Sequence, residues 1–303
     1  MFDESHRGGK YKIKTLFEEC LNMKKITRRS FLAAAGLSVA ALALTACGGS
    51  SSTASSAAAS SVASSAAASS EAASAAADIT TVEAGKLTMA TNATFPPYEM
   101  TTDNGTIEGI DVETAQAIAD KLGLELQVDD MDFDAALLSV QQGKADIAMA
   151  GITVTDERKA VMAFSDSYAT GIQSIIVPND SDIASPDDLA GKTIGTQRGT
   201  TGYIYCSDDF GDENVVAYDD GLTAVQALNN GQVDAVVIDN APAKEFVAAN
   251  PGLVILDTSY AEEDYAIGMA KGSALEDAIN ATLEELKADG TLQSIVDKYI
   301  TAE

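Results

Sequence analysis

The sequence predicts an α/β protein of two lobes built on a similar plan, and two internal echoes support this prediction. Residues 84–91 (AGKLTMAT) are echoed by residues 190–197 (AGKTIGTQ), and residues 140–149 (VQQGKADIAM) by residues 228–237 (LNNGQVDAVV). Each lobe would then contain a strand after Gly-Lys, and later a helix, a Gly-x-x-Asp turn and a second strand. Short echoes also arise by chance in α/β proteins. If these are real, the turns after the paired strands face each other across one cleft.

The elements of the first lobe are predicted from apolar spacing and turn residues. Residues 86–91 are typical of a short strand, and the prolines within residues 92–98 favour an irregular loop. Asp111 is expected to cap a helix that ends at Gly123, because apolar residues between them recur at helical spacing. The elements expected next are a strand at 124–128, a helix from Phe133 and a buried strand at 146–150.

The second lobe and the C-terminal part follow the same rules. Ser185 precedes Pro186, which predicts a capped helical turn, and residues 198–202 form a turn that enters a helix. The last long helix is amphipathic and ends at Gly290. Strands are expected at 172–177, 192–197, 233–238 and 265–269, and buried helical faces at Leu222, Val225 and Leu228 and at Leu275, Ile279, Leu283 and Leu286.

The amino terminus is predicted to be an export signal and not part of the fold. Residues 1–46 hold eight of the 19 basic residues, and they include an apolar run at 31–44 that is short for a membrane span. The run leads into Leu-Thr-Ala-Cys-Gly at residues 44–48, which resembles the lipobox of bacterial lipoproteins. This resemblance implies that Cys47 carries a lipid and is the first residue of the mature protein.

Two further features surround this signal. Met23 resembles a natural start, so residues 1–22 are interpreted as an over-called extension, and residues 27–32 resemble a twin-arginine signal, which leaves the export route open. Residues 47–77 are almost entirely Ser and Ala after the cysteine and cannot bury enough apolar surface to fold. They are predicted to form a disordered tether between the membrane and the folded part.

The charge balance and the histidine and cysteine content exclude several functions. The 303 residues include 46 acidic and 19 basic residues, for a net charge of −27, which disfavours binding to nucleic acid and to anionic lipid. The single histidine, His6, lies in the export signal, so histidine-based catalysis and histidine-rich metal sites are excluded, and no catalytic residue, cofactor or metal is expected. Once the signal is removed and Cys47 carries a lipid, Cys206 has no disulfide partner and is expected to be an inert thiol.

Arg158 is the first candidate for ligand binding. It follows the turn residues 151–157 (GITVTDE), which come directly after the apolar run 146–150. Ligands of α/β proteins bind beyond the carboxyl ends of strands, and the planar fork of arginine suits a carboxylate held by two bonds. Asp239 follows a strand of the other lobe, so the two charges would match the two ends of a zwitterion. A surface arginine paired with a neighbouring acid, and an Asp239 that only caps a helix, are the alternatives.

Six motifs together resemble one family, the polar amino-acid-binding proteins of bacterial ABC importers, solute-binding family 3. In order they are FPPYE at 95–99, GIDV at 109–112, GITVTDER at 151–158, FSDSY at 164–168, LAGK at 189–192 and QRGT at 197–200. The resemblance covers about three quarters of the chain and implies a type II periplasmic-binding-protein-like fold, with the ligand cleft between two lobes joined by two hinge strands. Lobe 1 would be residues 78–168 and 266–303, lobe 2 residues 169–265, and the hinges would lie near 168–171 and 262–265.

The resemblance also implies how the cleft would hold a free L-amino acid. The α-carboxylate would lie against Arg158 and the start of a helix, whose free N–H groups favour an anion. Thr153 and Thr200 could instead be simple helix caps, and phenylalanines are more often core residues than ligand contacts. The expected ligand-binding residues are Arg158, Thr153, Thr200 and Thr201 for the carboxylate, Asp239 and Gly151 for the ammonium, Phe95 and Phe133 on either side of the ligand, and Asn92 and Gln197 at its side chain.

The expected ligand is a neutral polar or small amino acid, because Asn92 and Gln197 are neutral and family members for cationic ligands often place an acid at the position of Asn92. A cyclohexadienyl-dehydratase-like enzyme on the same fold is the second hypothesis, although Glu99 and Glu157 are expected to face outward and no histidine is available for acid–base work. A ligand-presenting sensory module is the third.

The expected partners follow from the same resemblance. The protein would be a monomer on the extracytoplasmic face of a bacterial cell membrane, attached by its lipid, and it would deliver its amino acid to ABC permease and ATPase subunits.

Overall fold

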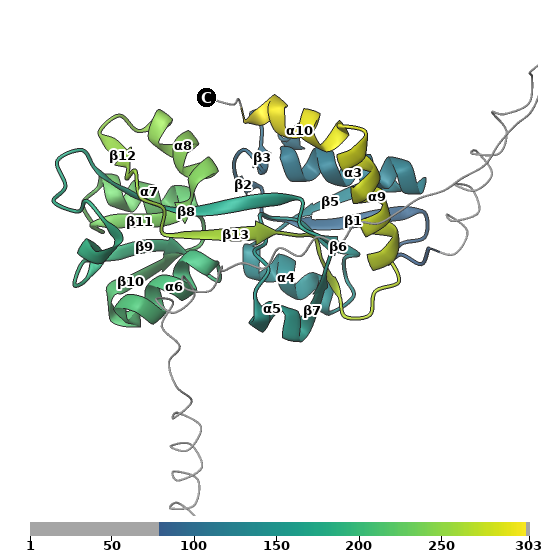
Figure 1. The fold of residues 1–303 in the computed structure, drawn as a ribbon, viewed down its shortest axis with the longest axis horizontal. Coiled ribbons are helices and arrows are strands. Elements are labelled where there is room, and N and C mark those ends of the chain that lie inside the picture. Colours follow the sequence, from purple (N-terminus) through teal and green to yellow (C-terminus); the bar gives the residue numbers. More distant parts are fainter. Residues whose placement is uncertain (1–78, 301–303) are drawn as a thin grey trace, which may run out of the picture. The chain divides into compact units, whose positions relative to one another are not determined.

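The computed structural model of the protein describes residues 79–300; the expected export signal, Cys47 and the expected tether lie outside the described residues. Two mixed sheets organise the described part, and we name the parts built on them lobe 1 and lobe 2 (Figure 1). The sheet of lobe 1 has the order β5 (Glu125–Asp130), β1 (Lys86–Thr91), β6 (Ile147–Ala148), β14 (Gly268–Ala270), β7 (Met162–Phe164). The sheet of lobe 2 has the order β10 (Val215–Tyr218), β9 (Ile194–Gln197), β11 (Ala235–Asp239), β8 (Ala169–Pro178), β12 (Leu253–Ile255), and β13 (Ala261–Tyr265) also pairs with β8.

Helices complete both lobes, and lobe 1 also contains a small three-stranded sheet. Lobe 1 contains α3 (Ile110–Leu122), α4 (Phe133–Gln141), α5 (Asp156–Val161), α9 (Glu276–Ala288), α10 (Thr291–Tyr299) and the sheet of β2 (Thr94–Phe95), β3 (Glu99–Thr101) and β4 (Ile107–Glu108). Lobe 2 contains η2 (Pro186–Leu189), α6 (Thr201–Phe210), η3 (Asp212–Asn214), α7 (Gly221–Asn229) and α8 (Asn240–Ala249). None of the helices within residues 79–300 combines the length and the apolar character needed to cross a membrane.

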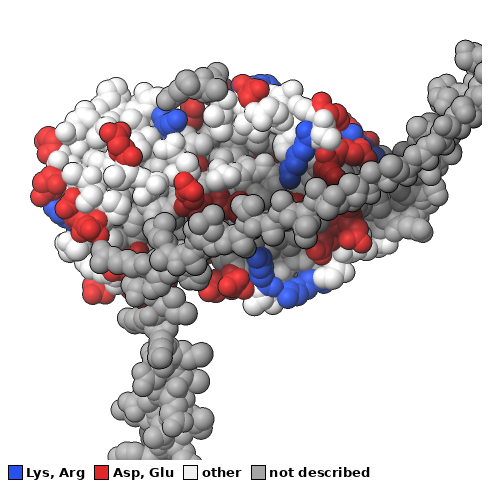
Figure 2. All heavy atoms as spheres, viewed as in Figure 1, with Lys and Arg blue, Asp and Glu red and all other residues white. Residues whose placement is uncertain are grey.

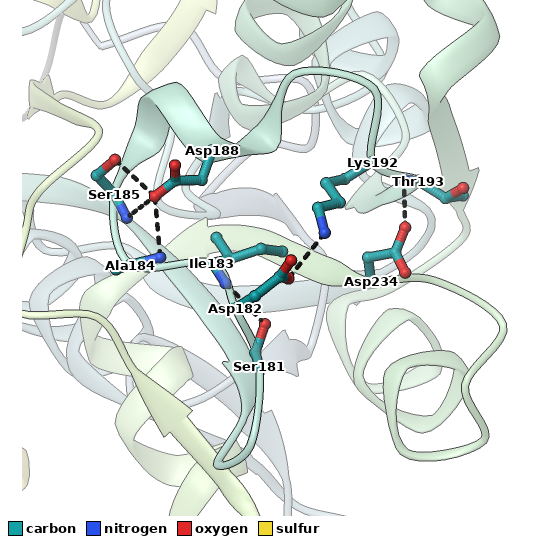
Figure 3. A network of polar contacts seen from close by, with 9 residues as sticks. All are labelled: Ser181, Asp182, Ile183, Ala184, Ser185, Asp188, Lys192, Thr193 and Asp234. Carbon is teal, nitrogen blue, oxygen red and sulfur yellow. Dashed lines mark hydrogen bonds and ion pairs between the residues drawn. The ribbon is translucent and has the colours of Figure 1, made fainter.

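The two sequence echoes occupy equivalent places in the two sheets. β1 pairs in parallel with β5 and β6, and β9 pairs in parallel with β10 and β11. The aspartates of the echoed Gly-x-x-Asp turns also have the same contact: Asp146 Oδ2 accepts from the N–H of Thr88 at 2.8 Å, and Asp234 Oδ2 accepts from the N–H of Thr193 at 2.7 Å (Figure 3). The prediction of two α/β lobes on one plan is therefore confirmed, and the carboxyl ends of β1, β6, β9 and β11 lead into the predicted site turns.

Two antiparallel strands, β8 and the shorter β13, connect the lobes. β8 follows β7 of lobe 1 in the chain, and it pairs with β13 in a register that runs from Ala169 opposite Tyr265 to Gln173 opposite Ala261. The predicted single strand at 265–269 is wrong, because β13 ends at Tyr265 and β14 begins at Gly268 in the other sheet. Between them the backbone changes partners: the N–H of Ala266 donates to the carbonyl of Ile152 at 3.1 Å. The break in pairing is where the chain passes from one lobe to the other.

Several helix predictions hold and one fails. Gly123 ends α3 in the left-handed conformation, as expected, but the N-cap is Gly109 and not Asp111. Asp111 lies inside the first turn, is fully buried, and accepts hydrogen bonds from the Tyr168 hydroxyl at 2.7 Å and the Gly151 N–H at 3.0 Å. Its side chain serves these long-range contacts, which a local capping pattern cannot reveal.

Other differences are smaller. The buried strand expected at 146–150 is reduced to the two residues of β6, and the Asp146 side chain before it bonds to the backbone N–H groups of Val82 and Thr88. Leu222, expected in a buried helical face, is 44% exposed at the start of α7, and the buried face of that helix runs through Ala224, Val225 and Leu228.

A polar network fixes the segment between β8 and β9 in lobe 2 (Figure 3). The predicted capped turn is present: Asp188 Oδ2 accepts from the N–H and hydroxyl of Ser185, both at 2.9 Å, and η2 begins at Pro186. Lys192 pairs with Asp182 at 2.8 Å at the surface. Figure 2 shows that acidic side chains are prominent on the visible surface of both lobes, in keeping with the net charge of −27.

Candidate functional site

A cavity lies between the two lobes, at the turns that follow β1, β6, β9 and β11. All ten predicted ligand-binding residues line it: Asn92, Phe95, Phe133, Gly151, Thr153, Arg158, Gln197, Thr200, Thr201 and Asp239. Five further residues, which the sequence analysis did not select, also line it: Glu99, Ala150, Gln173, Ile238 and Tyr265. The structure thus brings the predicted set together from both lobes, as expected when parallel strands of two similar sheets end at one cleft.

Arg158 is a buried cation at this cavity and not a surface residue. Its side chain is 8% exposed, with Nη1 donating to the carbonyl of Thr153 at 2.8 Å and Nη2 donating to the carbonyl of Gly199 at 3.1 Å. The Phe133 ring lies against it, with 5.3 Å between the guanidinium carbon and the ring centroid. An arginine has five N–H donors, so these two bonds leave donors free to form a two-bond pair with a carboxylate.

Burial also affects the charge of Arg158. Loss of solvation lowers the pKa of its guanidinium, and the negative charge of Glu263 is the largest opposing influence. The loss of water favours an anionic partner for Arg158, and the negative charge of Glu263 already supplies part of that compensation.

Asp239 lies at the end of β11 and has two roles. It caps α8, because Oδ1 accepts from the N–H of Ala241 at 3.0 Å, while Oδ2 accepts from the N–H of Ile172 at 2.6 Å. The helix-cap alternative is thus correct, and the same carboxyl, 2% exposed, also lines the cavity. Burial raises its pKa to about 6 against the opposing effect of the two backbone N–H groups. A carboxylate has about four lone-pair sites, so two bonds leave room for a cation.

Gly151 is required where the chain passes closest to the aromatic wall. Its φ is +54°, and an added Cβ would lie 2.8 Å from Cε1 of Phe95 and 3.2 Å from the ring of Tyr265. The Gly151 N–H donates to Asp111, whose pKa burial raises to about 6. The buried Asp111 thereby holds the turn that leads to Arg158.

Two amides meet across the cleft. Gln197 Nε2 of lobe 2 donates to Asn92 Oδ1 of lobe 1 at 2.9 Å, and Asn92 Nδ2 donates to the carbonyl of Met131 at 3.0 Å. The predicted side-chain end of the site is therefore polar, neutral at these two positions, and connected between the lobes. Phe95 forms the adjacent wall and stacks on Tyr98 with 5.9 Å between ring centroids.

Thr153, Thr200 and Thr201 have different roles. Thr200 is the N-cap of α6, which agrees with the capping alternative. The hydroxyls of Thr153 and Thr201 both donate to Oε2 of Glu263, at 3.0 and 2.9 Å. Glu263 was not among the ligand-binding residues predicted from the sequence. Alternation along residues 261–265 places it on the same strand face as Tyr265, and this was the signal that could have found it.

The expectation that Glu99 faces outward is wrong, whereas Glu157 is exposed as expected. Glu99 is fully buried in β3, opposite Phe95, and lines the cavity. Neither of its carboxyl oxygens has a hydrogen-bond partner within residues 79–300. Burial first, and then the nearby charge of Asp111, raise the pKa of Glu99 well above its usual range. The short hairpin turns this side chain inward, and a hairpin of two-residue and three-residue strands gives little sequence pattern.

Residues 87–302 match the family model for bacterial extracellular solute-binding proteins, family 3. The arginine-binding extracellular protein ArtP of Bacillus subtilis (strain 168) is 34% identical over 228 residues, which cover 72% of this chain and 87% of ArtP. The L-cystine-binding protein TcyJ of Escherichia coli (strain K12) is 31% identical over 225 residues, covering 73% of this chain and 85% of TcyJ. An ancestral arginine-binding protein, solved with bound glutamine, is 40% identical with a TM-score of 0.69, and the match covers 73% of this chain and 100% of that chain.

The fold and these matches agree with the motif resemblance. The family match spans most of the chain and includes the ten predicted cleft residues. The two relatives and the solved structure are 31 to 40% identical to this chain, so similarity of sequence and of structure point to the same family. The chain belongs to the bacterial extracellular solute-binding proteins of family 3.

Proposed function

We propose that this protein is the substrate-binding component of an ABC amino-acid importer, which captures an L-amino acid between its lobes and delivers it to a permease. The observation that carries the proposal is the presence of a guanidinium and a carboxylate, Arg158 of lobe 1 and Asp239 of lobe 2, in the lining of one cavity. A free amino acid presents the complementary pair of charges a short distance apart, and few other small molecules do so.

The carboxylate of the ligand lies against Arg158 in this proposal. Donors of Arg158 remain after its two carbonyl bonds, and the first backbone N–H groups of α6, at Thr201, add the positive end of the helix dipole. The ammonium lies against Asp239 and the carbonyl of Gly151. Burial has removed most of the water from both charged residues, so each contact is stronger than at a surface.

Capture proceeds by closure of the lobes. We assign residues 78–168 and 266–303 to one moving body and residues 169–265 to the other, with hinges at 168–171 and 262–265, where β8 and β13 join the sheets. A ligand that contacts both bodies favours the closed arrangement, since only differential contact shifts such an equilibrium.

The side chain of the ligand faces the amides of Asn92 and Gln197, and we propose that it is neutral and polar. These amides already exchange a hydrogen bond with each other, and each still offers a donor or an acceptor. The raised pKa of Glu99 favours its neutral, protonated form, which also suits a neutral side chain.

A basic amino acid is the second candidate, and Glu99 is the observation that favours it. A buried carboxyl without a hydrogen-bond partner would gain an ion pair with a guanidinium or an ammonium, which would also release its proton. ArtP is named for arginine, and the ancestral relative was solved with glutamine, so both classes occur among similar proteins.

The remaining parts of the proposal come from the sequence. Cys47 is lipid-modified, the Ser/Ala-rich residues to 77 are a tether, and the protein acts as a monomer at the extracytoplasmic face of the membrane with ABC permease and ATPase subunits. It releases its ligand unchanged, in contrast to the dehydratase alternative. A sensory role would differ only in the partner that receives the closed protein.

Arg158→Ala is expected to weaken amino-acid binding by about 100-fold or more, because it leaves a buried ligand carboxylate without its charged partner. Isothermal titration with the tightest-binding of the twenty amino acids measures the effect. Arg198→Ala is the matched control, since Arg198 lies nearby with a 56% exposed side chain, and it should change affinity less than threefold. Near-normal affinity in the Arg158 variant would refute the proposed site.

Affinity is expected to fall as the solution becomes more acidic than about pH 6. In the empty site the pKa of Asp239 is raised to about 6, so below that pH the carboxyl is protonated and must lose its proton before it can pair with an ammonium. The loss should approach about tenfold per pH unit between pH 6 and pH 4.5. Titrations of the wild type and of Asp239→Asn test this, because the variant should bind weakly and lack this dependence. A flat wild-type profile would contradict the assigned role.

The side-chain class is tested by titrating all twenty amino acids into wild type, Glu99→Gln and the exposed control Glu157→Gln. A neutral polar ligand should bind wild type and Glu99→Gln within about threefold of each other, since a protonated Glu99 and a glutamine are both neutral. The opposite result would be that the wild type binds only arginine or lysine, and that this binding is weakened tenfold or more in Glu99→Gln but not in Glu157→Gln. This result would reject the neutral ligand in favour of the basic one.

A further inference from the structure

A carboxylate on a connecting strand joins residues from both lobes. Glu263 lies in the middle of β13, is 6% exposed, and accepts three hydrogen bonds at one oxygen, Oε2. The donors are the hydroxyl of Thr153 at 3.0 Å, the hydroxyl of Thr201 at 2.9 Å and Nε2 of Gln173 at 3.0 Å. The other oxygen, Oε1, has no hydrogen-bond partner within the described residues.

The donors come from different parts of the molecule. Thr153 belongs to the turn of lobe 1 that leads to Arg158, and Thr201 begins α6 of lobe 2. Glu263 is on the strand between them. Whichever lobe carries Glu263 during closure, one of its two threonine bonds therefore crosses from one lobe to the other. Each of these bonds uses groups of the chain itself, so the contact can form with or without a ligand.

The backbone fixes the lobe 1 end of this contact. The N–H of Val154 donates to the carbonyl of Asp264 at 3.0 Å, and Thr153 and Tyr265 form an isolated antiparallel bridge. The turn before Arg158 is thus attached to the same strand that carries Glu263. Burial lowers the pKa of the Arg158 guanidinium, and the negative charge of Glu263 is the largest of the influences that raise it. The charge of Glu263 therefore also acts on Arg158.

The hydroxyl protons limit what the threonines can do for a ligand. A hydroxyl has one proton to donate, and Thr153 and Thr201 each donate it to Glu263. In this arrangement neither hydroxyl can also donate to a ligand carboxylate. The carboxylate would be held by Arg158 and backbone N–H groups, and the threonine side chains would serve the contact with Glu263 instead.

We propose that Glu263 is a positioning residue that draws Thr153 and Thr201 together across the cleft and so assembles the carboxylate-binding donors of both lobes before the ligand arrives. The inference rests on the proposed function for the identity of the ligand group, whereas the contact between the lobes is a property of the chain alone. Pre-assembly increases the fraction of binding-competent protein, and apparent affinity rises in proportion to that fraction.

The test follows the distance between the lobes by single-molecule energy transfer in the full chain. Dyes are attached to p-acetylphenylalanine at positions 159 and 208, which are exposed on α5 and α6, so that the natural cysteines are not involved. The variants are Glu263→Ala, Glu263→Gln and Thr201→Val, and the matched control is Glu262→Gln, an exposed acid one position away on the same strand. Each is measured without amino acid and with a saturating amount of the tightest-binding one.

Without amino acid, the wild type and Glu262→Gln should show a substantial short-distance population, and Glu263→Ala should lose most of it. Saturating ligand should restore the short distance in every variant, with affinity for Glu263→Ala lowered about tenfold through the reduced closed fraction. A residue that only stabilises the strand would lower the unfolding midpoint without changing this distribution. An unchanged distribution in Glu263→Ala, or a wild type that is entirely open without ligand, would overturn the proposal.

Folding of the variants does not limit the test. If Glu263→Ala does not fold, two milder variants replace it: Glu263→Gln keeps the size of the side chain, and Thr201→Val removes a single hydroxyl. The proposal then stands only if at least one of these variants reduces the short-distance population. Failure of the proposed function is a separate result, because it would appear as the absence of binding to any amino acid, while the distances measured without ligand would remain informative.

Discussion

The structure depends on the burial of one cation, Arg158, at the boundary between two lobes. Removing a guanidinium from water is unfavourable unless its donors and its charge find partners. The protein provides a carbonyl from each lobe, Thr153 and Gly199, and the face of Phe133. These partners satisfy part of the group and leave donors unused, which is why we propose that the site binds an anion.

The carboxyls around this cation differ in what they do because their surroundings differ. Asp239 is held by two backbone N–H groups and retains capacity for a cation. Asp111 is held by a hydroxyl and the Gly151 N–H, and it shapes the turn that leads to Arg158. Glu263 is held by side chains from both lobes, and Glu99 has no hydrogen-bond partner in the described part of the chain. In our proposal these four buried acids therefore have different roles: ligand binding for Asp239, support of the turn for Asp111, lobe closure for Glu263 and specificity for Glu99.

Much of the site could be predicted from the sequence because the turns after parallel strands converge in space. The strand and turn signals around Gly151, Arg158 and Asp239 were strong, and the ten predicted residues do line one cavity. The burial of Asp111 and Glu99 could not be identified from the sequence, whereas alternation along 261–265 was an unused signal for Glu263. Glu99 is buried through a short hairpin and Asp111 through contacts with Tyr168 and Gly151, which are distant in the sequence. The same limitation explains the incorrect strand at 265–269, where an apolar run continues while the chain changes sheets.

The most direct test of the central claim, that the two lobes hold the two charged ends of one free amino acid, compares the tightest-binding amino acid with its α-carboxamide and its N-acetyl derivative by calorimetry. The three compounds share a side chain and differ in one charged end at a time. Each derivative is predicted to bind wild type at least about 100-fold more weakly, and the acid and the carboxamide should bind Arg158→Ala with similar affinity. Tight binding of either derivative to the wild type would contradict the account.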